Sequence, residues 1–220
     1  MNGAFAALLG AMASVTAQAA EISGNIGAHF DHVDRGLSLA REEGAASAAL
    51  YADFRQGVWL GATALRVDAP DGSDANFALA AGRTYAFDAY ELDLSLSLDA
   101  FVGGRDFLYP ELRARLSRDL GLLKATAGLA YAPDGRWFVR NEQTLYGYVE
   151  AEVPVPRVPW LTIVAHAGYE TISDAADKAD WGLGLAAGWS SFELSLGYED
   201  SDRDIRIGRA RFTAALRLFF

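Results

Sequence analysis

The sequence predicts an all-β protein, a transmembrane up-and-down antiparallel β-barrel of about 12 strands that follows a cleaved signal peptide. Three observations predict this fold. Runs of alternating polar and apolar residues repeat along the chain, the connections between them alternate between long and short, and the final run carries an unbroken apolar stripe. Charged residues make up 22% of the 220 residues. No stretch of about 20 apolar residues follows the N-terminal segment, so helical membrane spans are not expected.

The first 19 residues form an apolar segment without a charged side chain, ending in Ala17-Gln18-Ala19. Small residues before a cleavage point are typical of a secretory signal peptide, although the usual positive start is missing here. We therefore predict a signal peptide over residues 1–19 and a barrel over residues 20–220, with an N-terminal membrane anchor as the alternative. Cysteine is absent, which excludes a disulfide framework and thiolate chemistry.

The runs beyond Ala20 have roughly the 9–11 residues that a tilted membrane strand needs. They lie near residues 21–31, 46–54, 58–67, 76–86, 90–101, 109–117, 122–131, 145–153, 161–169, 181–190, 192–198 and 209–220. Longer polar segments follow the odd-numbered runs, at residues 32–45, 68–75, 102–108, 132–144, 170–180 and 199–208. Even-numbered runs are followed by turns as short as Ser191 alone. A barrel with short periplasmic turns and longer extracellular loops produces this alternation.

Alternation within the runs assigns one face of each strand to lipid and the other to the barrel interior. The run at residues 90–101 sets leucines against acids and serines. The run at residues 181–190 sets Trp181 and Trp189 at the two ends of an aliphatic face, with glycines opposite. Aromatic side chains at both ends of an apolar band are typical of membrane interfaces.

Two runs have a less certain orientation. In residues 58–67, either of the two sets of alternate side chains is apolar enough to face lipid. In residues 76–86 the apolar phase also contains Arg83. We expect Arg83 near a membrane interface, where the free-energy cost of a charged side chain facing lipid is lower. Alternatively, a β-bulge beside it would turn the following side chains to the opposite face.

The final run, residues 211–220, has the clearest pattern. Apolar side chains occupy one face as far as the terminal Phe220, whereas Arg211 and Arg217 lie on the other. This pattern is typical of the closing strand of an outer-membrane barrel. We expect the terminal aromatic to serve as the signal that the barrel assembly machinery reads.

Polar side chains opposite the apolar stripes are the candidates for lining the lumen. They are Asp53, Glu91, Asp93, Asp99, Arg113, Arg115, Lys124, Glu150, Glu152, His166, Glu193, Arg211 and Arg217. Rings of such charges can hold hydrated ions or polar solutes along a permeation path. The alternative is that acids on one strand neutralise bases on the next. The acidic run 90–101 does precede the basic run 109–117, and Glu193 precedes Arg211 and Arg217.

These features indicate a channel for passive diffusion of small polar solutes or ions across the outer membrane of a Gram-negative cell. Acidic residues in the loop segments 68–74 and 170–180 create a negative electrostatic field at the mouth of the barrel. This field predicts a weak preference of the channel for cations. The net charge of −10 argues against a nucleic-acid partner. Outer-membrane lipid and lipopolysaccharide are expected partners, and the sequence does not indicate an oligomeric state.

Three other functions stay open. A structural or adhesive barrel would be plugged by its own side chains, and a soluble ligand-binding barrel would expose large apolar patches to water. A lipid-acting barrel enzyme would need a serine or carboxylate beside His29 or His166. Residues 200–204 have the spacing of a calcium loop, but Ile205 and Arg211 stand where glycine and glutamate are required. No catalytic residue, metal or cofactor is therefore predicted.

Several short motifs resemble those of a known family. They are Arg35-Gly36-Leu37-Ser38, Tyr131-Ala132-Pro133-Asp134, Ala167-Gly168-Tyr169 and the terminal phenylalanine. Together they make most of the mature chain similar to the TorF-type porins of proteobacteria. The chain departs from that family in its first loop, where Phe30-Asp31-His32-Val33-Asp34 is followed by the charged Arg41-Glu42-Glu43. The resemblance implies a barrel with a transport role, but it implies neither a substrate nor a mechanism.

Overall fold

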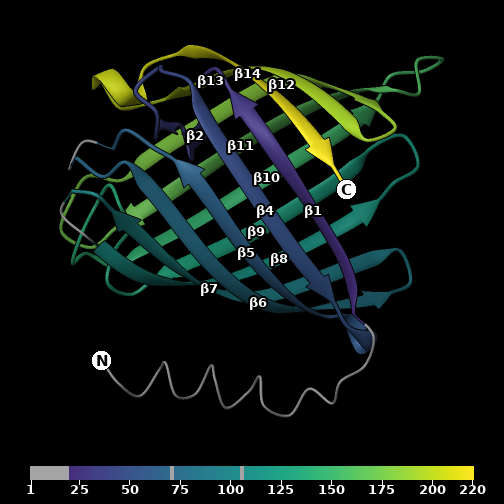
Figure 1. The fold of residues 1–220 in the computed structure, drawn as a ribbon, viewed down its shortest axis with the longest axis horizontal. Coiled ribbons are helices and arrows are strands. Elements are labelled where there is room, and N and C mark those ends of the chain that lie inside the picture. Colours follow the sequence, from purple (N-terminus) through teal and green to yellow (C-terminus); the bar gives the residue numbers. More distant parts are fainter. Residues whose placement is uncertain (1–19, 70–71, 105–106) are drawn as a thin grey trace.

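A computed structural model describes residues 20–69, 72–104 and 107–220, and it shows a closed antiparallel barrel of twelve strands (Figure 1). The barrel strands are β1 (Glu21–His29), β4 (Ala45–Asp53), β5 (Val58–Arg66), β6 (Ala75–Phe87), β7 (Tyr90–Val102), β8 (Phe107–Asp119), β9 (Lys124–Ala132), β10 (Thr144–Pro154), β11 (Leu161–Ile172), β12 (Lys178–Trp189), β13 (Phe192–Ser201) and β14 (Arg211–Phe219). Each pairs with its neighbours in the chain, and β1 closes the barrel against β14. The predicted all-β antiparallel barrel of about twelve strands is thus confirmed, whereas the predicted signal peptide, residues 1–19, lies outside the described residues. In the described residues, no helix is both long enough and apolar enough to cross a membrane.

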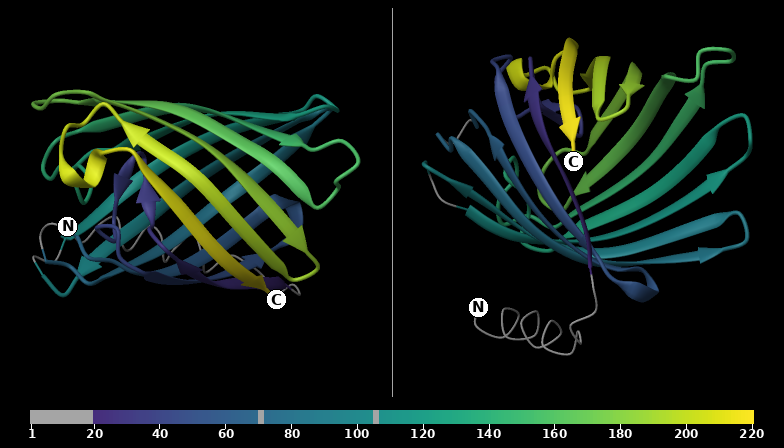
Figure 2. Two further views of the ribbon diagram at one scale, coloured as in Figure 1. Left: turned by 90° about the horizontal axis from the view of Figure 1, so that it is seen from above. Right: turned by 45° about the vertical axis from the view of Figure 1, so that its right-hand side comes forward.

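The two ends of the barrel differ in the length of their connections. At the turn end, where β14 finishes, the connections include Asp88-Ala89 and the 3-10 helix η1 (Arg55–Gly57) (Figure 1). Asp88 has φ 52°, a left-handed conformation that a short polar side chain tolerates in a tight turn. The opposite, loop end carries the longer connections, among them residues 30–44 and 133–143 (Figure 2).

Two connections at the loop end are shorter than expected. The segment predicted at 102–108 is reduced to residues 103–106, and that predicted at 170–180 to residues 173–177. The strands continue further because their last inward side chains find partners inside the barrel, as described below. Consequently Glu170, which we expected in a loop, is a strand residue with a buried side chain.

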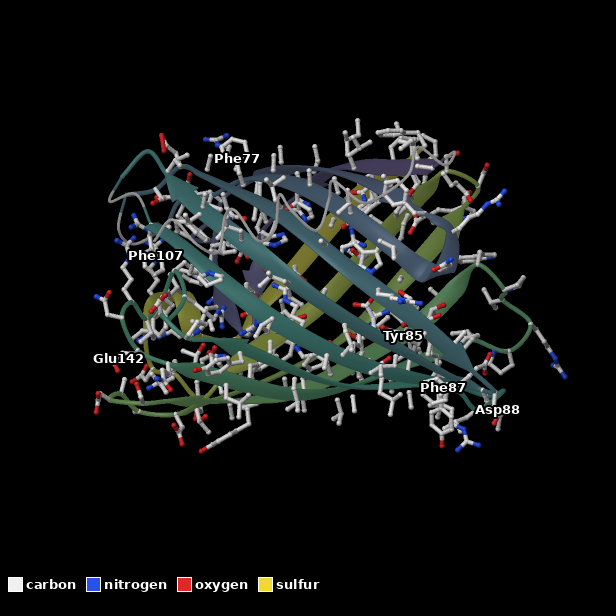
Figure 3. The ribbon with its side chains drawn as sticks, turned by 90° about the horizontal axis from the view of Figure 1, so that it is seen from below. Phe77, Tyr85, Phe87, Asp88, Phe107 and Glu142 are labelled. Carbon is white, nitrogen blue, oxygen red and sulfur yellow. The ribbon has the colours of Figure 1, made fainter. Side chains whose placement is uncertain are left out.

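The outer face of the barrel is apolar over its whole circumference. Phe77 points away from the wall in Figure 3, and Leu183 is 59% exposed and Phe212 77% exposed. In β5, Val58 and Leu60 lie on this outer face and Trp59 on the inner one, which settles the phase that the sequence left open. So much exposed apolar area is unfavourable in water and favourable in lipid.

Arg83 lies on the outer face without any bulge. The register of β6 runs unbroken through the pairs that Arg83 makes with Val58 and Leu94. Its guanidinium lies 4.7 Å from the centre of the Tyr85 ring. Figure 3 shows Tyr85 near the turn end with Phe87. The alternative of a bulge is therefore wrong, and the position of Arg83 toward the turn end is compatible with the expected interface.

A small apolar core lies inside the barrel at the loop end. Its residues come from four loops and from the loop ends of the adjoining strands, and Leu37 and Ala132 are completely buried. The members are Leu37, Leu39, Ala40, Ala45, Leu65, Val67, Ala69, Phe101, Tyr109, Ala132, Trp137 and Ile207. Ile207 belongs to the short 3-10 helix η2 (Arg206–Gly208). This part of the loop end is therefore packed like the interior of a soluble domain.

Candidate functional site in the barrel lumen

The pairing of the strands defines one continuous inner face. Register pairs such as Glu152 with Lys124 and Glu193 with Arg217 lie on it, whereas the exposed leucines lie on the opposite face. All the predicted lumen candidates fall on this inner face: Asp53, Glu91, Asp93, Asp99, Arg113, Arg115, Lys124, Glu150, Glu152, His166, Glu193, Arg211 and Arg217. Their placement follows from the strand phase alone. Contact with a solute remains a proposal.

The lumen also holds a segment that the sequence did not place there. The first loop folds inward as a plug hairpin, residues 31–38, which contains β2 (Val33–Asp34) paired with β3 (Leu37–Ser38) (Figure 1). Its turn is Arg35-Gly36, both at positive φ. A Cβ atom on Gly36 would lie 2.6 Å from the Cβ atom of Asp180, so only glycine permits this close approach to the wall.

Arg35 attaches the tip of the plug hairpin to the barrel wall. Its Nη2 atom donates to both carboxylate oxygens of Glu111 at 2.7 Å, and Nη1 donates to Glu170 Oε1 at 3.3 Å. The guanidinium also lies 4.5 Å from the centre of the Tyr146 ring. All three charged side chains are less than 10% exposed. Pairs of this kind are strong in a low-dielectric interior, and removing one partner leaves a buried charge.

Arg136, from the loop at residues 133–143, attaches the hairpin from a second direction. It pairs with Asp34 and donates to Glu170 Oε1 at 2.6 Å, while Trp137 Nε1 donates to Asp34 at 2.9 Å. Loss of bulk water raises the pKa of Asp34, but Arg136 and Arg35 lower it by more and hold it well below its usual range. Burial lowers the pKa of Arg136, and Asp34 and Glu170 raise it well above the usual value. Both groups are therefore charged.

A third cluster holds the hairpin backbone. Lys178 donates to the carbonyl oxygen of Arg35 and lies 3.0 Å from Asp180 and 3.7 Å from Glu170. Tyr146 donates to Asp180 at 2.9 Å. The sequence predicted these acids and Lys178 as part of an extracellular loop, and that prediction is wrong. They lie on strands β11 and β12 because the plug hairpin offers them partners inside the barrel.

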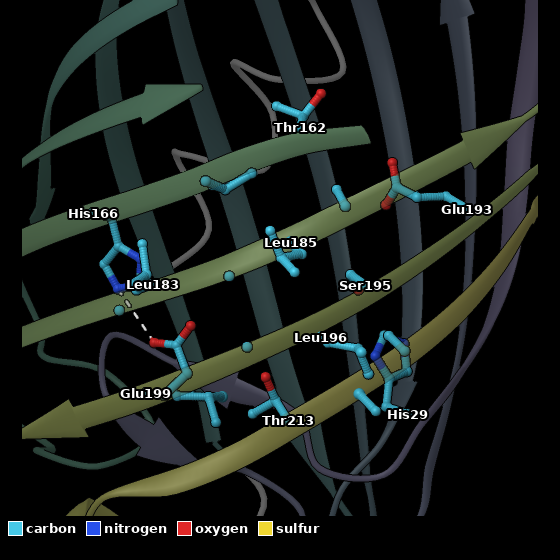
Figure 4. Close-up of a pocket in the computed structure, with 18 of the residues that line it drawn as sticks. His29, Thr162, His166, Leu183, Leu185, Glu193, Ser195, Leu196, Glu199 and Thr213 are labelled. Atoms are coloured by element: carbon cyan, nitrogen blue, oxygen red, sulfur yellow. Dashed lines mark ion pairs between the residues drawn. The ribbon is translucent and has the colours of Figure 1, made fainter. Parts of the chain in front are cut away.

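The plug hairpin lies between two cavities of the lumen, and a smaller third cavity, of about 310 Å³, lies beside its tip at Arg35, Tyr146 and Glu150. The first, of about 500 Å³, lies between the hairpin residues Asp31, His32 and Val33 and the wall formed by β10 to β14 (Figure 4). The second, of about 400 Å³, lies between the hairpin and the wall formed by β1 and β4 to β8. We call them the acidic cavity and the capped cavity. Glu150, Glu152, Glu193 and Glu199 line the acidic cavity, and Leu39, Leu65, Phe101, Tyr109 and Trp137 of the apolar core line the capped one.

Among the described residues, the predicted neutralisation between neighbouring strands occurs at the Glu193–Arg217 pair and at the Glu170–Lys178 pair. Arg217 Nη1 lies 2.8 Å from Glu193 Oε1. Arg211, which we also expected opposite Glu193, instead pairs with Asp31 of the plug hairpin at 3.1 Å. Arg113 pairs with Glu111 on its own strand at 2.6 Å. The hairpin thus takes up part of the charge that the sequence assigned to neighbouring strands.

Two histidines have polar partners across the strands. His29 Nε2 lies 2.8 Å from Ser47 Oγ on the adjacent strand β4. His166 Nε2 lies 3.3 Å from Glu199 Oε2, as Figure 4 shows, and 3.7 Å from Asp180 Oδ1. Sequence reasoning missed these contacts because they depend on strand register. All five side chains lie on the lumen face and away from lipid.

Comparisons with known proteins agree with a barrel of this kind. A family model described as "Bacterial protein of unknown function (Gcw_chp)" matches residues 13–217. The comparison with curated proteins gives no match.

Solved porin structures share the fold. The KdgM porin is 14% identical with a TM-score of 0.61, covering 90% of this chain and 99% of its own. The structure of the KdgM porin in complex with disordered oligogalacturonate is 14% identical with a TM-score of 0.59, and it covers 90% of this chain and 99% of its own. The NanC porin is 8% identical with a TM-score of 0.59, covering 91% of this chain and 99% of its own. At these identities the likeness concerns the fold.

Proposed function

This chain belongs to the Gcw_chp family of bacterial proteins, and we propose that it is an outer-membrane porin through which small polar solutes or ions diffuse passively, with a weak preference for cations. One observation carries the proposal. A closed barrel presents an apolar outer face and a charged inner face around internal cavities. Such a wall suits lipid outside and hydrated solutes inside. The proposal involves no bond made or broken.

The membrane assignment rests on the outer face. Exposed leucines and phenylalanines form the band, and Trp160 and Trp189 stack at 5.4 Å between ring centres at the turn end. Trp and Tyr at the edges of an apolar band are typical of membrane interfaces. We propose the outer membrane of a Gram-negative cell, with lipid and lipopolysaccharide around the barrel and Phe220 as the signal for the assembly machinery. Membership of the TorF-type porins belongs to this proposal as well.

The cation preference rests on the inner face, where acids outnumber bases in the described strands. The acids are Glu21, Asp53, Glu91, Asp93, Asp99, Glu111, Asp119, Glu150, Glu152, Glu170, Asp180, Glu193 and Glu199. The bases are Arg113, Arg115, Lys124, Lys178, Arg211 and Arg217. Low-dielectric walls focus such a field and concentrate cations. Anionic oligogalacturonate, present with the KdgM porin, would be repelled by this lumen.

Recording in a planar lipid bilayer tests the channel. We expect discrete steps of current from purified protein whose strand content is confirmed by circular dichroism. Folded protein that gives no steps in wild type or in a variant lacking the plug hairpin would overturn the proposal.

The contact between His29 and Ser47 supports a second candidate, a hydrolase with a serine nucleophile. The pair lies on the lumen face, so a lipid acyl chain would have to enter the barrel to reach it. A fluorophosphonate probe should label Ser47 if the pair is a nucleophile and its base. We expect no labelling, with Ser47→Ala as the control. A structural or adhesive barrel would give neither labelling nor current.

A further inference from the structure

We propose that the plug hairpin divides the lumen into one conducting and one blind compartment, so that cations cross the barrel through the acidic cavity alone. This inference rests on the proposed porin function and deepens it. It assigns the route to one side of the lumen and the selectivity to the carboxylates on that side. The two cavities differ in the residues that bound them at the loop end.

The capped cavity ends against the apolar core. Leu39, Leu65, Phe101 and Trp137 line this cavity and also belong to the buried core at the loop end. The ring centres of Phe101 and Trp137 lie 6.2 Å apart. The cap of this cavity therefore consists of closely packed aromatic and aliphatic side chains. An ion that entered such a layer would lose its hydration without gaining a partner, which costs many times the thermal energy. The capped cavity is therefore blind at this end.

The acidic cavity has a different boundary. None of the apolar core residues in the described chain lines it. Its hairpin side carries Asp31, whose carboxylate pairs with Arg211, and its wall carries His166 beside Glu199. His166 and Glu199 are partly exposed and can exchange hydrogen bonds with water and ions, whereas the Asp31–Arg211 pair is almost completely buried. An ion on this side therefore meets polar partners, which the apolar core does not offer. The passage therefore lies on this side of the hairpin.

The floor and walls of the acidic cavity favour small cations. Gly182 and Gly197 accommodate the neighbouring side chains of β11, β13 and β14, and Glu150 and Glu152 line the cavity from β10. Neither glutamate has an ion pair among the residues that the structure describes, so both can attract mobile cations. The narrowing by the hairpin restricts the passage to ions and very small solutes. Oligosaccharides would not pass while it is in place.

Blocking each cavity separately tests the division. The chain has no cysteine, so Ser195→Cys in the acidic cavity and Thr63→Cys in the capped cavity each introduce a single thiol. Both side chains are half-buried and point inward. Each variant is reconstituted, its current is recorded, and a bulky methanethiosulfonate is then added. Because the modification follows folding, a change in current reports on the passage itself. Thr162→Cys and Ala49→Cys form a second matched pair.

We expect the reagent to reduce the unit current several-fold in Ser195→Cys and Thr162→Cys, with almost no change in Thr63→Cys and Ala49→Cys. Mass spectrometry confirms that each thiol has reacted. Equal block from both sides, or block from the capped side alone, would overturn the division and leave the porin function standing. An absence of current from every variant before the reagent is added, the hairpin-deleted one included, would instead overturn the porin function.

Discussion

Arg35 is the residue on which the position of the plug hairpin depends most. It is the one hairpin side chain that bonds to β8 and β11 together, through Glu111 and Glu170, in the described part of the chain. Both acids are buried, so their charges need this partner. Arg136 pairs with Glu170 as well, but among the described residues Glu111 has only Arg113 as a further cation within 4 Å.

We predict that Arg35→Gln destabilises the docked hairpin by about 3–5 kcal/mol, the usual cost of removing one partner of a buried ion pair. The hairpin should then become accessible to protease in the reconstituted protein, while the barrel strands stay protected. Arg209→Gln is the matched control, because its pair with Asp204 is largely exposed and should matter little. Unchanged protection of the hairpin in Arg35→Gln would contradict this role.

A second prediction at this scale concerns Glu150 and Glu152. Replacing both by glutamine removes two charges from the acidic cavity without changing its volume, so the preference for cations should weaken. The measurement is the zero-current potential across a salt gradient, which should move toward zero. Asp204→Asn, at a highly exposed loop carboxylate, should leave the potential unchanged. A larger shift from Asp204→Asn than from the double variant would argue that loop charges set the selectivity.

Strand phase predicts individual residues well wherever a strand is regular. The lumen candidates all fall on the inner face, and Glu111 could have been included because it shares the phase of Arg113. Asp34, Arg35 and Arg136 could not be found this way. They lie in loops, where no periodicity relates position in the sequence to direction in space.

The plug hairpin is the element that distinguishes this lumen from an open tube. The segment was predicted as an extracellular loop, yet Leu37, Leu39 and Ala40 are buried in the core at the loop end. That apolar cluster within a charged loop is the signal that could have indicated an inward fold. The position of the hairpin inside the barrel depends on contacts with Glu111 and Glu170, which are far away in sequence. Local sequence patterns therefore cannot predict this position.

Shortening the hairpin should widen the passage. We predict that replacing residues 32–38 by a short Gly-Ser linker raises the unit conductance and admits larger sugars in a liposome-swelling assay. The matched control is a shortened loop at residues 173–177, which are exposed and lie outside the lumen. An equal conductance for the two shortened variants would show that the hairpin does not restrict the passage.

The docked hairpin should respond to pH through His32. Burial lowers the pKa of His32 from its ordinary value near 6.5, Asp34 and Asp31 raise it by less, and Arg217 lowers it further. His29 also faces it, with ring centres 5.0 Å apart. A hairpin released into water would regain the ordinary pKa and bind a proton first, so acidification through about pH 6.5 favours release.

We therefore predict that conductance rises as pH falls from 7.5 to 5.5, and that His32→Gln flattens this dependence. Asp34 does not contribute in this window. Its pKa is held well below the usual range, so the stability it supplies is present above the ordinary carboxyl pKa and lost only in stronger acid. A pH dependence that persists unchanged in His32→Gln would assign the effect to another group.

At the scale of the whole molecule, the sequence predicts the barrel because two independent periodicities agree. Alternation along each strand sets the two faces, and alternation of connection lengths sets the up-and-down order. The interior is less predictable, since its shape depends on which loops fold inward. The result is a barrel with an apolar outer face, a cap of loop residues at one end and a charged lumen divided by a hairpin.

The zero-current potential of the reconstituted protein across a potassium chloride gradient tests the central claim most directly, because it requires both a passage and a charge preference. We predict a measurable current whose reversal potential has the sign of a cation-preferring channel. A reversal potential of the opposite sign, or no current from folded protein with or without its plug hairpin, would contradict the account.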